Sequence, residues 1–139
     1  MKWVIDSSRQ AFESFRFLSY ERQEVVTAIA LNSQFELLEI REIFRGTIDK
    51  SLAQPREILQ FAFETNAAKI VIGHNHPSGN CFPSDEDCEF THRLWKACEL
   101  MGIPLLDHLV VGGRDYFSFA DSGQLKGRLS LSEQPLKPA

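Results

Sequence analysis

The stretch AKIVIGHNHPSGNCFPSDED, residues 68–87, contains the two patterns that decide the fold. It begins with a short apolar run, which predicts a buried strand, and continues into a loop rich in Gly and Pro. Apolar residues at helical spacing then predict a helix over residues 85–101. Ser84 is its expected N-cap with Asp87 as the capping-box partner, and Gly102 follows its last turn. The sequence therefore predicts a strand, a loop and a helix in succession, and such loops commonly carry function.

The residues on the N-terminal side predict a hairpin and two more helices. Two β-rich runs within residues 24–44 are separated by a turn-prone Asn-Ser pair at residues 32–33, which predicts an antiparallel hairpin. The first run is apolar on both faces, and this favours a central strand that is covered on both sides. We expect a short amphipathic helix over residues 8–18, packed at the edge of the sheet, and a second helix from Pro55 to Asn66.

The residues on the C-terminal side complete the predicted sheet. The runs PLLDHLVV and YFSF are expected as strands around a Gly-Gly-Arg-Asp turn at residues 112–115. All these elements together predict an α/β fold with a mixed, curved β-sheet flanked by helices. We expect three parts of the chain: a helical lead-in over residues 1–20, one domain over residues 21–125 and a flexible tail over residues 126–139.

The composition restricts the partners and the compartment. The 139 residues are 43% hydrophobic and 24% charged with a formal charge of -4, as in one folded domain without the basic field that phosphate binding needs. Three cysteines show no CxxC spacing, and no apolar run reaches the length of a signal peptide or a membrane helix. We therefore expect a cytoplasmic protein with no strong nucleic-acid signal and no membrane association.

Three side chains are candidate metal ligands. His74 and His76 are two residues apart at the end of the predicted strand, so their imidazoles project to the same side. The pair alone is equally compatible with a solvated loop. Asp87 lies four residues before Thr91 on the apolar stripe of the predicted helix, where a carboxylate must be paired, hydrogen-bonded or metal-bound. Capping of the helix N-terminus is the simpler alternative for Asp87.

The combination of two imidazoles and one carboxylate indicates a catalytic zinc site. Such a site leaves the fourth tetrahedral position for water, whereas a structural zinc site requires a fourth protein ligand. Asp107 and His108, in a later predicted strand, could orient one another or a zinc ligand, because zinc-bound imidazoles usually donate their other N–H to an oxygen. A satisfied polar pair in a strand is an equally good interpretation of these two residues.

The motif resembles that of the RadC-like proteins, a branch of the JAB/MPN (JAMM) metalloprotease superfamily. The superfamily pattern is an upstream Glu, then His-x-His, seven residues, Ser, two residues and Asp, and residues 74–87 reproduce its second part without a gap. The resemblance extends from about Glu21 to Gly123, through EVVTAIALNSQ, FRGTID, PREI, NAA and DHLVVGG. It implies the MPN/JAB fold, which is similar to that of cytidine deaminases.

The resemblance also implies a function and a role for each motif position. The implied activity is hydrolysis of a peptide or isopeptide bond through a zinc-activated water, so the expected partner is a peptide or protein substrate. His74, His76 and Asp87 are the implied Zn²⁺ ligands, and Ser84 is the implied donor to the oxyanion.

The implied general base is the upstream Glu. We assign this role to Glu24 because it shares a strand face with Val26 and Ala28, so its carboxylate can point into the fold. Glu21 is the competing candidate. The simpler interpretation of either residue is a solvated charge at a strand entrance.

Two other functions are weaker interpretations. A metal-dependent nuclease or DNA-repair role is suggested by the literal string HNH and by the family's historical label. However, HNH nucleases disperse those residues over a ββα unit, and only about twenty residues precede the motif here, whereas RadC-like chains commonly carry an N-terminal helix-hairpin-helix segment. A non-catalytic MPN interaction module typically lacks metal ligands, which this chain retains. The oligomeric state is not determined by the sequence.

Overall fold

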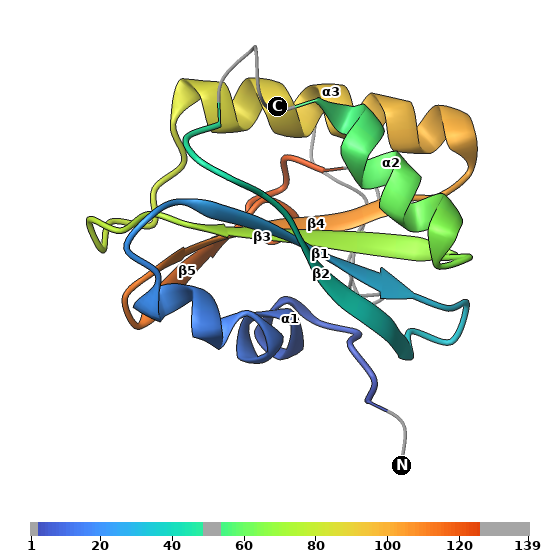
Figure 1. Cartoon of the computed structure of the whole chain (residues 1–139), viewed down its shortest axis with the longest axis horizontal. Coiled ribbons are helices and arrows are strands. Elements are labelled where there is room, and N and C mark those ends of the chain that lie inside the picture. The colour runs from blue at the N-terminus through green and yellow to red at the C-terminus, as the bar shows by residue number, and fades with distance from the viewer. Residues whose placement is uncertain (1–2, 49–53, 126–139) are drawn as a thin grey trace.

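The computed structural model describes residues 3–48 and 54–125, which form a five-stranded sheet with helices on both faces (Figure 1). The α/β fold with a mixed sheet is therefore confirmed. The strands are β1 (Val25–Leu31), β2 (Leu37–Arg45), β3 (Lys69–Asn75), β4 (Leu105–Gly112) and β5 (Asp115–Ser118). The helices are α1 (Ser8–Ser14), a short 3-10 helix (Arg16–Tyr20), α2 (Pro55–Glu64) and α3 (Asp85–Met101).

The sheet has the strand order β2-β1-β3-β4-β5. β1 pairs antiparallel with both β2 and β3, β3 pairs parallel with β4, and β4 pairs antiparallel with β5. The predicted hairpin is present as β1 and β2. β1 lies between β2 and β3 and is buried along its whole length, as expected for a strand that is apolar on both faces.

Side chains alternate between two separate cores on the two sheet faces. Val26, Ala28 and Ala30 of β1 pack with residues of α2 and α3, whereas Ile29 and Leu31 pack with residues of α1. Figure 1 shows α2 and α3 on one side of the sheet and α1 on the other. A helix therefore begins at the predicted residue 8, but it ends at Ser14 and a 3-10 helix follows it, so its predicted end at residue 18 is wrong. Its predicted position at the sheet edge is also wrong, because it covers a face of the sheet.

Aromatic packing explains the position of the N-terminal helices. Phe12 and Phe15 are almost fully buried in the core beneath the sheet. The Phe15 ring lies against Gly73 of β3, where an added Cβ would be only 2.6 Å from the ring. A strand edge could not enclose two aromatic side chains in this way, so burial of their apolar area favours the face.

The predicted strand–loop–helix unit has the expected order, with β3 longer than predicted. β3 continues through His74 and Asn75, and α3 begins and ends at the predicted residues. The side chain of Ser84 caps α3 with Asp87 as the reciprocal partner, and Gly102 ends it in the left-handed conformation with φ 73°.

Two further sequence predictions concern the flexible C-terminal tail and the absence of a membrane helix. The predicted flexible tail, residues 126–139, lies outside the described residues. Among the helices of the described residues, none combines the length and the apolar character that are needed to cross a membrane.

Candidate metal centre

His74 and His76 lie at the end of β3, and their rings converge. His74 is fully buried and pairs in the sheet with Val26 of β1 and Val110 of β4. His76 follows the strand, and its backbone N–H still donates to the carbonyl of Val111 at 2.9 Å. The two ring centroids are 5.1 Å apart, with the rings nearly edge to face. The strand alternation predicted from the His-x-His spacing therefore places both imidazoles on one side.

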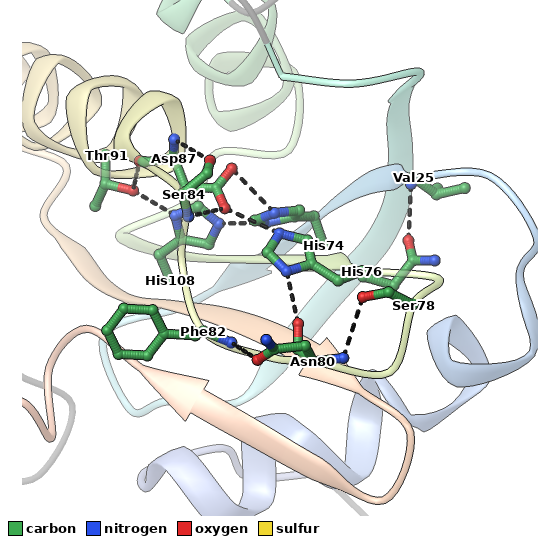
Figure 2. A network of polar contacts seen from close by, with 11 residues as sticks. Val25, His74, His76, Ser78, Asn80, Phe82, Ser84, Asp87, Thr91 and His108 are labelled. Carbon is green, nitrogen blue, oxygen red and sulfur yellow. Dashed lines mark hydrogen bonds and ion pairs between the residues drawn. The ribbon is translucent and has the colours of Figure 1, made fainter.

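Asp87 brings its carboxylate to both histidines from the first turn of α3 (Figure 2). Its Oδ2 is 3.0 Å from Nε2 of His76, and its Oδ1 is 3.3 Å from Nε2 of His74. The same Oδ2 accepts the N–H of Ser84 at 2.9 Å, which is the capping interaction. The carboxylate is 2% exposed. The capping and the ligand interpretations of Asp87 are therefore compatible, because one carboxylate makes both sets of contacts.

The electrostatics of this cluster keep the carboxylate ionised. Burial opposes its charge, but the contacts from His74 and His76 and the Ser84 N–H hold the pKa of Asp87 well below its usual value. The hydrogen bond that His76 donates to the carboxylate of Asp87 in turn raises the pKa of His76 above its usual value. A buried anion between two imidazoles is the local charge distribution that attracts a cation.

Glu24 approaches the histidines from the entrance of β1. One carboxylate oxygen of Glu24 and one ring nitrogen each of His74 and His76 lie within 4.8 Å of one another, a spacing that could hold a metal ion. Asp87 adjoins this group through its direct contacts with both rings. Glu21 has a different partner, because its carboxylate pairs with Arg45 at 3.0 Å. Of the two candidate glutamates, Glu24 is therefore the one beside the histidines.

The cluster opens into a cleft. A cavity of about 460 Å³ is lined by Glu24, His76, Ser84 and Asp87, together with Thr47, Ile48, Pro77, Ser78 and Glu86. The Ser84 Oγ accepts the N–H of Asp87 at 3.0 Å, and its hydroxyl donates no hydrogen bond to another group among the described residues. This hydrogen can therefore be donated to a group that enters the cleft.

Asn75, between the two histidines, is a positioning residue that the sequence reasoning missed. It is 1% exposed, and its Oδ1 accepts the N–H of Val25 at 2.8 Å. Its Nδ2 donates to the carbonyl of Gln23 at 2.9 Å and lies 3.4 Å from that of Glu21. One amide thus ties the backbone on both sides of Glu24 to β3. The only signal in the sequence was its position between the two histidines, because the predicted strand ended at Gly73 and placed Asn75 in the loop.

The pair Asp107 and His108 has two different roles. The carboxylate of Asp107 accepts bonds from Ser118 Oγ and from the N–H groups of His108 and Ala120, and so braces the backbone of β4 and β5. The ring of His108 instead lies against a predicted ligand, with its Nε2 2.8 Å from Nδ1 of His74. Of the two interpretations left open by the sequence, His108 fits the orientation of a ligand and Asp107 fits a satisfied structural group.

The donor atoms fit a bound zinc ion. His74 Nε2 is buried, and it makes no hydrogen bond within residues 3–48 and 54–125. Its 3.3 Å contact with Asp87 Oδ1 lacks hydrogen-bond geometry, so a buried polar atom is left without its usual compensation. Imidazole nitrogens and carboxylate oxygens are preferred zinc ligands, and a cation between them would satisfy this atom.

Comparisons with known proteins give one consistent result. The sequence model of the RadC-like JAB domain matches residues 5–124. A UPF0758 protein of Streptococcus gordonii is 41% identical over 122 residues, which are 88% of this chain and 54% of that protein. A UPF0758 protein of Actinobacillus pleuropneumoniae is 46% identical over 104 residues, which are 75% of this chain and 47% of that protein. The chain thus spans about half the length of these curated relatives.

Proposed function

The chain belongs to the RadC-like JAB domain family, and on that basis we propose that it is a zinc-dependent metallohydrolase that cleaves a peptide or isopeptide bond. His74, His76 and Asp87 are the proposed metal ligands, Glu24 is the proposed general base and Ser84 the proposed oxyanion donor. The proposed substrate is a peptide or protein.

The observation that carries the proposal is the convergence of these groups at one end of the sheet. Glu24, His74 and His76 offer ligand atoms within 4.8 Å of one another, and Asp87 contacts both histidines. A solvated surface cluster would not leave His74 Nε2 buried and without a hydrogen bond. The unpaired buried nitrogen of His74 supports a metal-binding role for this cluster more strongly than a purely structural network.

The residues around the proposed ion supply the remaining chemistry. When bound, zinc activates a water molecule and polarises the carbonyl of the substrate. Glu24 takes a proton from the attacking water and delivers it to the leaving amine as the C–N bond breaks. The Ser84 hydroxyl donates to the oxyanion that develops on the carbonyl oxygen, a contribution of about 3 to 4 kcal/mol in well-placed cases.

The cleft supports a substrate with an exposed, extended segment. Its volume of about 460 Å³ holds only a few residues, and it is open to solvent beside the loop that carries His76, Pro77 and Ser78. The scissile carbonyl would lie between Glu24 and Ser84, which line the same cleft as Asp87. A compact folded chain could not place its backbone there without local unfolding.

Metal analysis of the protein purified without chelator tests the ligand set. We expect about one zinc per chain, and we expect that His74→Ala and Asp87→Ala each bind zinc much more weakly. Ser84→Ala is the matched control, because Ser84 contacts the carboxylate but is assigned to the oxyanion. Full zinc affinity in Asp87→Ala, or loss of zinc in Ser84→Ala, would contradict these roles.

Hydrolysis assays with the zinc-loaded protein test the reaction class. Internally quenched peptides and lysine-linked isopeptides are suitable substrates. We expect that Glu24→Gln keeps zinc and loses turnover, because an amide cannot accept the water proton. Glu21→Gln removes an equivalent charge three residues away and is expected to keep full activity. Equal turnover by Glu24→Gln and the wild-type protein would disprove the assignment of the base.

A further inference from the structure

A chain of three buried side chains connects α3, β4 and β3 behind the proposed ligands (Figure 2). Thr91 Oγ1 lies 2.5 Å from Nδ1 of His108, and Nε2 of His108 lies 2.8 Å from Nδ1 of His74. All three residues are at most 2% exposed. No solvent is therefore available to exchange the roles of donor and acceptor along this chain.

The hydroxyl of Thr91 sets the direction of every proton in the chain. A hydroxyl has a single hydrogen, and Thr91 Oγ1 donates to the carbonyl of Asp87 at 2.7 Å, one helical turn earlier. Since that hydrogen is used, the short contact with His108 requires that Nδ1 of His108 donates. A neutral His108 then has a bare Nε2, which accepts the N–H of His74 Nδ1.

We propose that Thr91 and His108 are positioning residues that hold His74 in the Nδ1–H tautomer, so that the lone pair of its Nε2 is directed at the metal position. This inference rests on the proposed function for the identity of the ion, but the proton on Nδ1 of His74 follows from the hydrogen bonds alone. In the opposite tautomer, Nε2–H would face Asp87 Oδ1, and the nitrogen could not act as a ligand.

The three hydrogen-bonded side chains Thr91, His108 and His74 form a relay, and aromatic packing fixes the orientation of its middle residue, His108. The His108 ring stacks on Phe119, with centroids 5.0 Å apart and planes at 17°. Phe90 of α3 lies edge to face with it, with centroids 6.3 Å apart. His108 therefore cannot rotate to bring another atom to His74 without displacing the core.

The relay also connects two ligands to each other. It starts at the backbone carbonyl of Asp87, and it ends at the ring of His74, which faces the side chain of Asp87. A single residue of α3 is thus fixed by the same hydrogen bonds that select the tautomer of His74. The position of the first turn of α3 and the position of the proton on the His74 ring are therefore coupled.

Nitrogen NMR of the metal-free protein tests the tautomers directly. Spectra of protein labelled with ¹⁵N-histidine, recorded with chelator at pH 8, are expected to show a proton on Nδ1 of His74. His108 is expected in the same tautomer. A His74 spectrum that shows Nδ1 without a proton would overturn the proposal, whether or not the protein binds zinc.

Two variants of one residue test the consequence for the metal. Thr91→Val keeps the shape of the side chain but removes the acceptor of the His108 N–H, and we expect zinc affinity, measured by competition with a chelator, to fall roughly 10- to 100-fold. Thr91→Ser restores the hydroxyl and is expected to bind zinc as the wild-type protein does. Wild-type affinity in folded Thr91→Val would overturn the proposal.

The outcomes separate this proposal from the proposed function. If the wild-type protein binds no zinc and the expected tautomers are observed, the proposed function fails and the positioning roles of Thr91 and His108 stand. If zinc binds with normal affinity in both Thr91 variants, the relay fails and the hydrolase proposal is unaffected.

Discussion

At the scale of single residues, two glutamates that are three positions apart have different partners. Glu21 forms an exposed ion pair with Arg45, whereas Glu24 reaches the histidines. Asn75 explains much of this difference, because its amide binds the backbone on both sides of Glu24. A carboxylate that must accept a proton in a defined direction needs such a fixed backbone, since a displacement of about 1 Å can cost a large factor in rate.

The contribution of Asn75 can be separated from general stability. We expect that Asn75→Ala lowers turnover at least about 10-fold while zinc affinity changes little, because Glu24 loses its support and the histidines keep theirs. Asn32→Ala is a matched control, since Asn32 also bonds neighbouring backbone groups but lies in the β1–β2 turn. A parallel loss of zinc and turnover in folded Asn75→Ala would contradict this prediction.

The His76–Asp87 pair gives the metal-free protein a defined dependence on pH. The hydrogen bond to Asp87 in the folded state raises the pKa of His76 above its usual value of about 6.5, so the stabilisation is fully present below about pH 6.5 and is lost as the pH rises through the folded value. In chelator, we expect the advantage of wild type over His76→Gln in free energy of unfolding to be about 1 kcal/mol at pH 6 and smaller at pH 9. Denaturant titrations at both pH values measure it, and an advantage that grows with pH would refute it.

At the scale of elements, the site is formed where two element ends meet. The C-terminal end of β3 carries His74, and the first turn of α3 carries Asp87 beneath its Ser84 cap. β3 is held at that end by β1 on one side and by β4 on the other, so the position of His74 depends on three strands. The capping box of α3 likewise fixes the position of a proposed ligand, because the Ser84 N–H binds and orients the carboxylate of Asp87.

The contact of Gly73 with Phe15 packs the C-terminal end of α1 against the strand that carries His74. An added Cβ at Gly73 would lie 2.6 Å from the Phe15 ring, so we expect Gly73→Ala to lower the free energy of unfolding by about 1 to 3 kcal/mol. Phe15→Leu should relieve the clash, and the double variant is therefore expected to lose less than the sum of the two single changes. Additive losses in denaturant unfolding would show that the ring does not limit this position.

At the scale of the whole molecule, two cores share one sheet. One core joins α2 and α3 to the even-numbered face of β1, and the other joins α1 to the opposite face. The proposed metal lies at the margin of the first core, between a strand and a helix. A bound ion would therefore connect α3 to the sheet in addition to their apolar contacts.

Removal of zinc is therefore expected to destabilise the whole fold. A ligand present at about 100 times its dissociation constant stabilises the native state by about 2.7 kcal/mol. We expect chelation to lower the Tm of the wild-type protein by roughly 5 to 10 °C. His74→Ala is the control, because its Tm should not respond to chelator. An equal response of both proteins would mean that the chelator acts elsewhere.

Local patterns in the sequence determined the elements and half of the site. The alternation of side chains along a strand brought His74 and His76 together, and the capping box determined the first turn of α3, because both effects act within a few residues. The spacing of the motif matched that of the RadC-like family, and this resemblance assigned Asp87 to the same site as the two histidines. These predictions required no knowledge of which strands are neighbours.

Only the tertiary structure decided between the alternatives that the sequence left open for the distant residues of the site, Glu24 or Glu21 and the two interpretations of His108. The antiparallel register that opposes Val26 to His74 brings Glu24 to the cluster, and the parallel pairing of β3 with β4 brings His108 behind His74. The position of α1 also depends on a contact between distant segments, because the Phe15 ring packs against Gly73 of β3. Strand order and register depend on contacts between segments far apart in the chain, and periodicity within one segment carries no information about them.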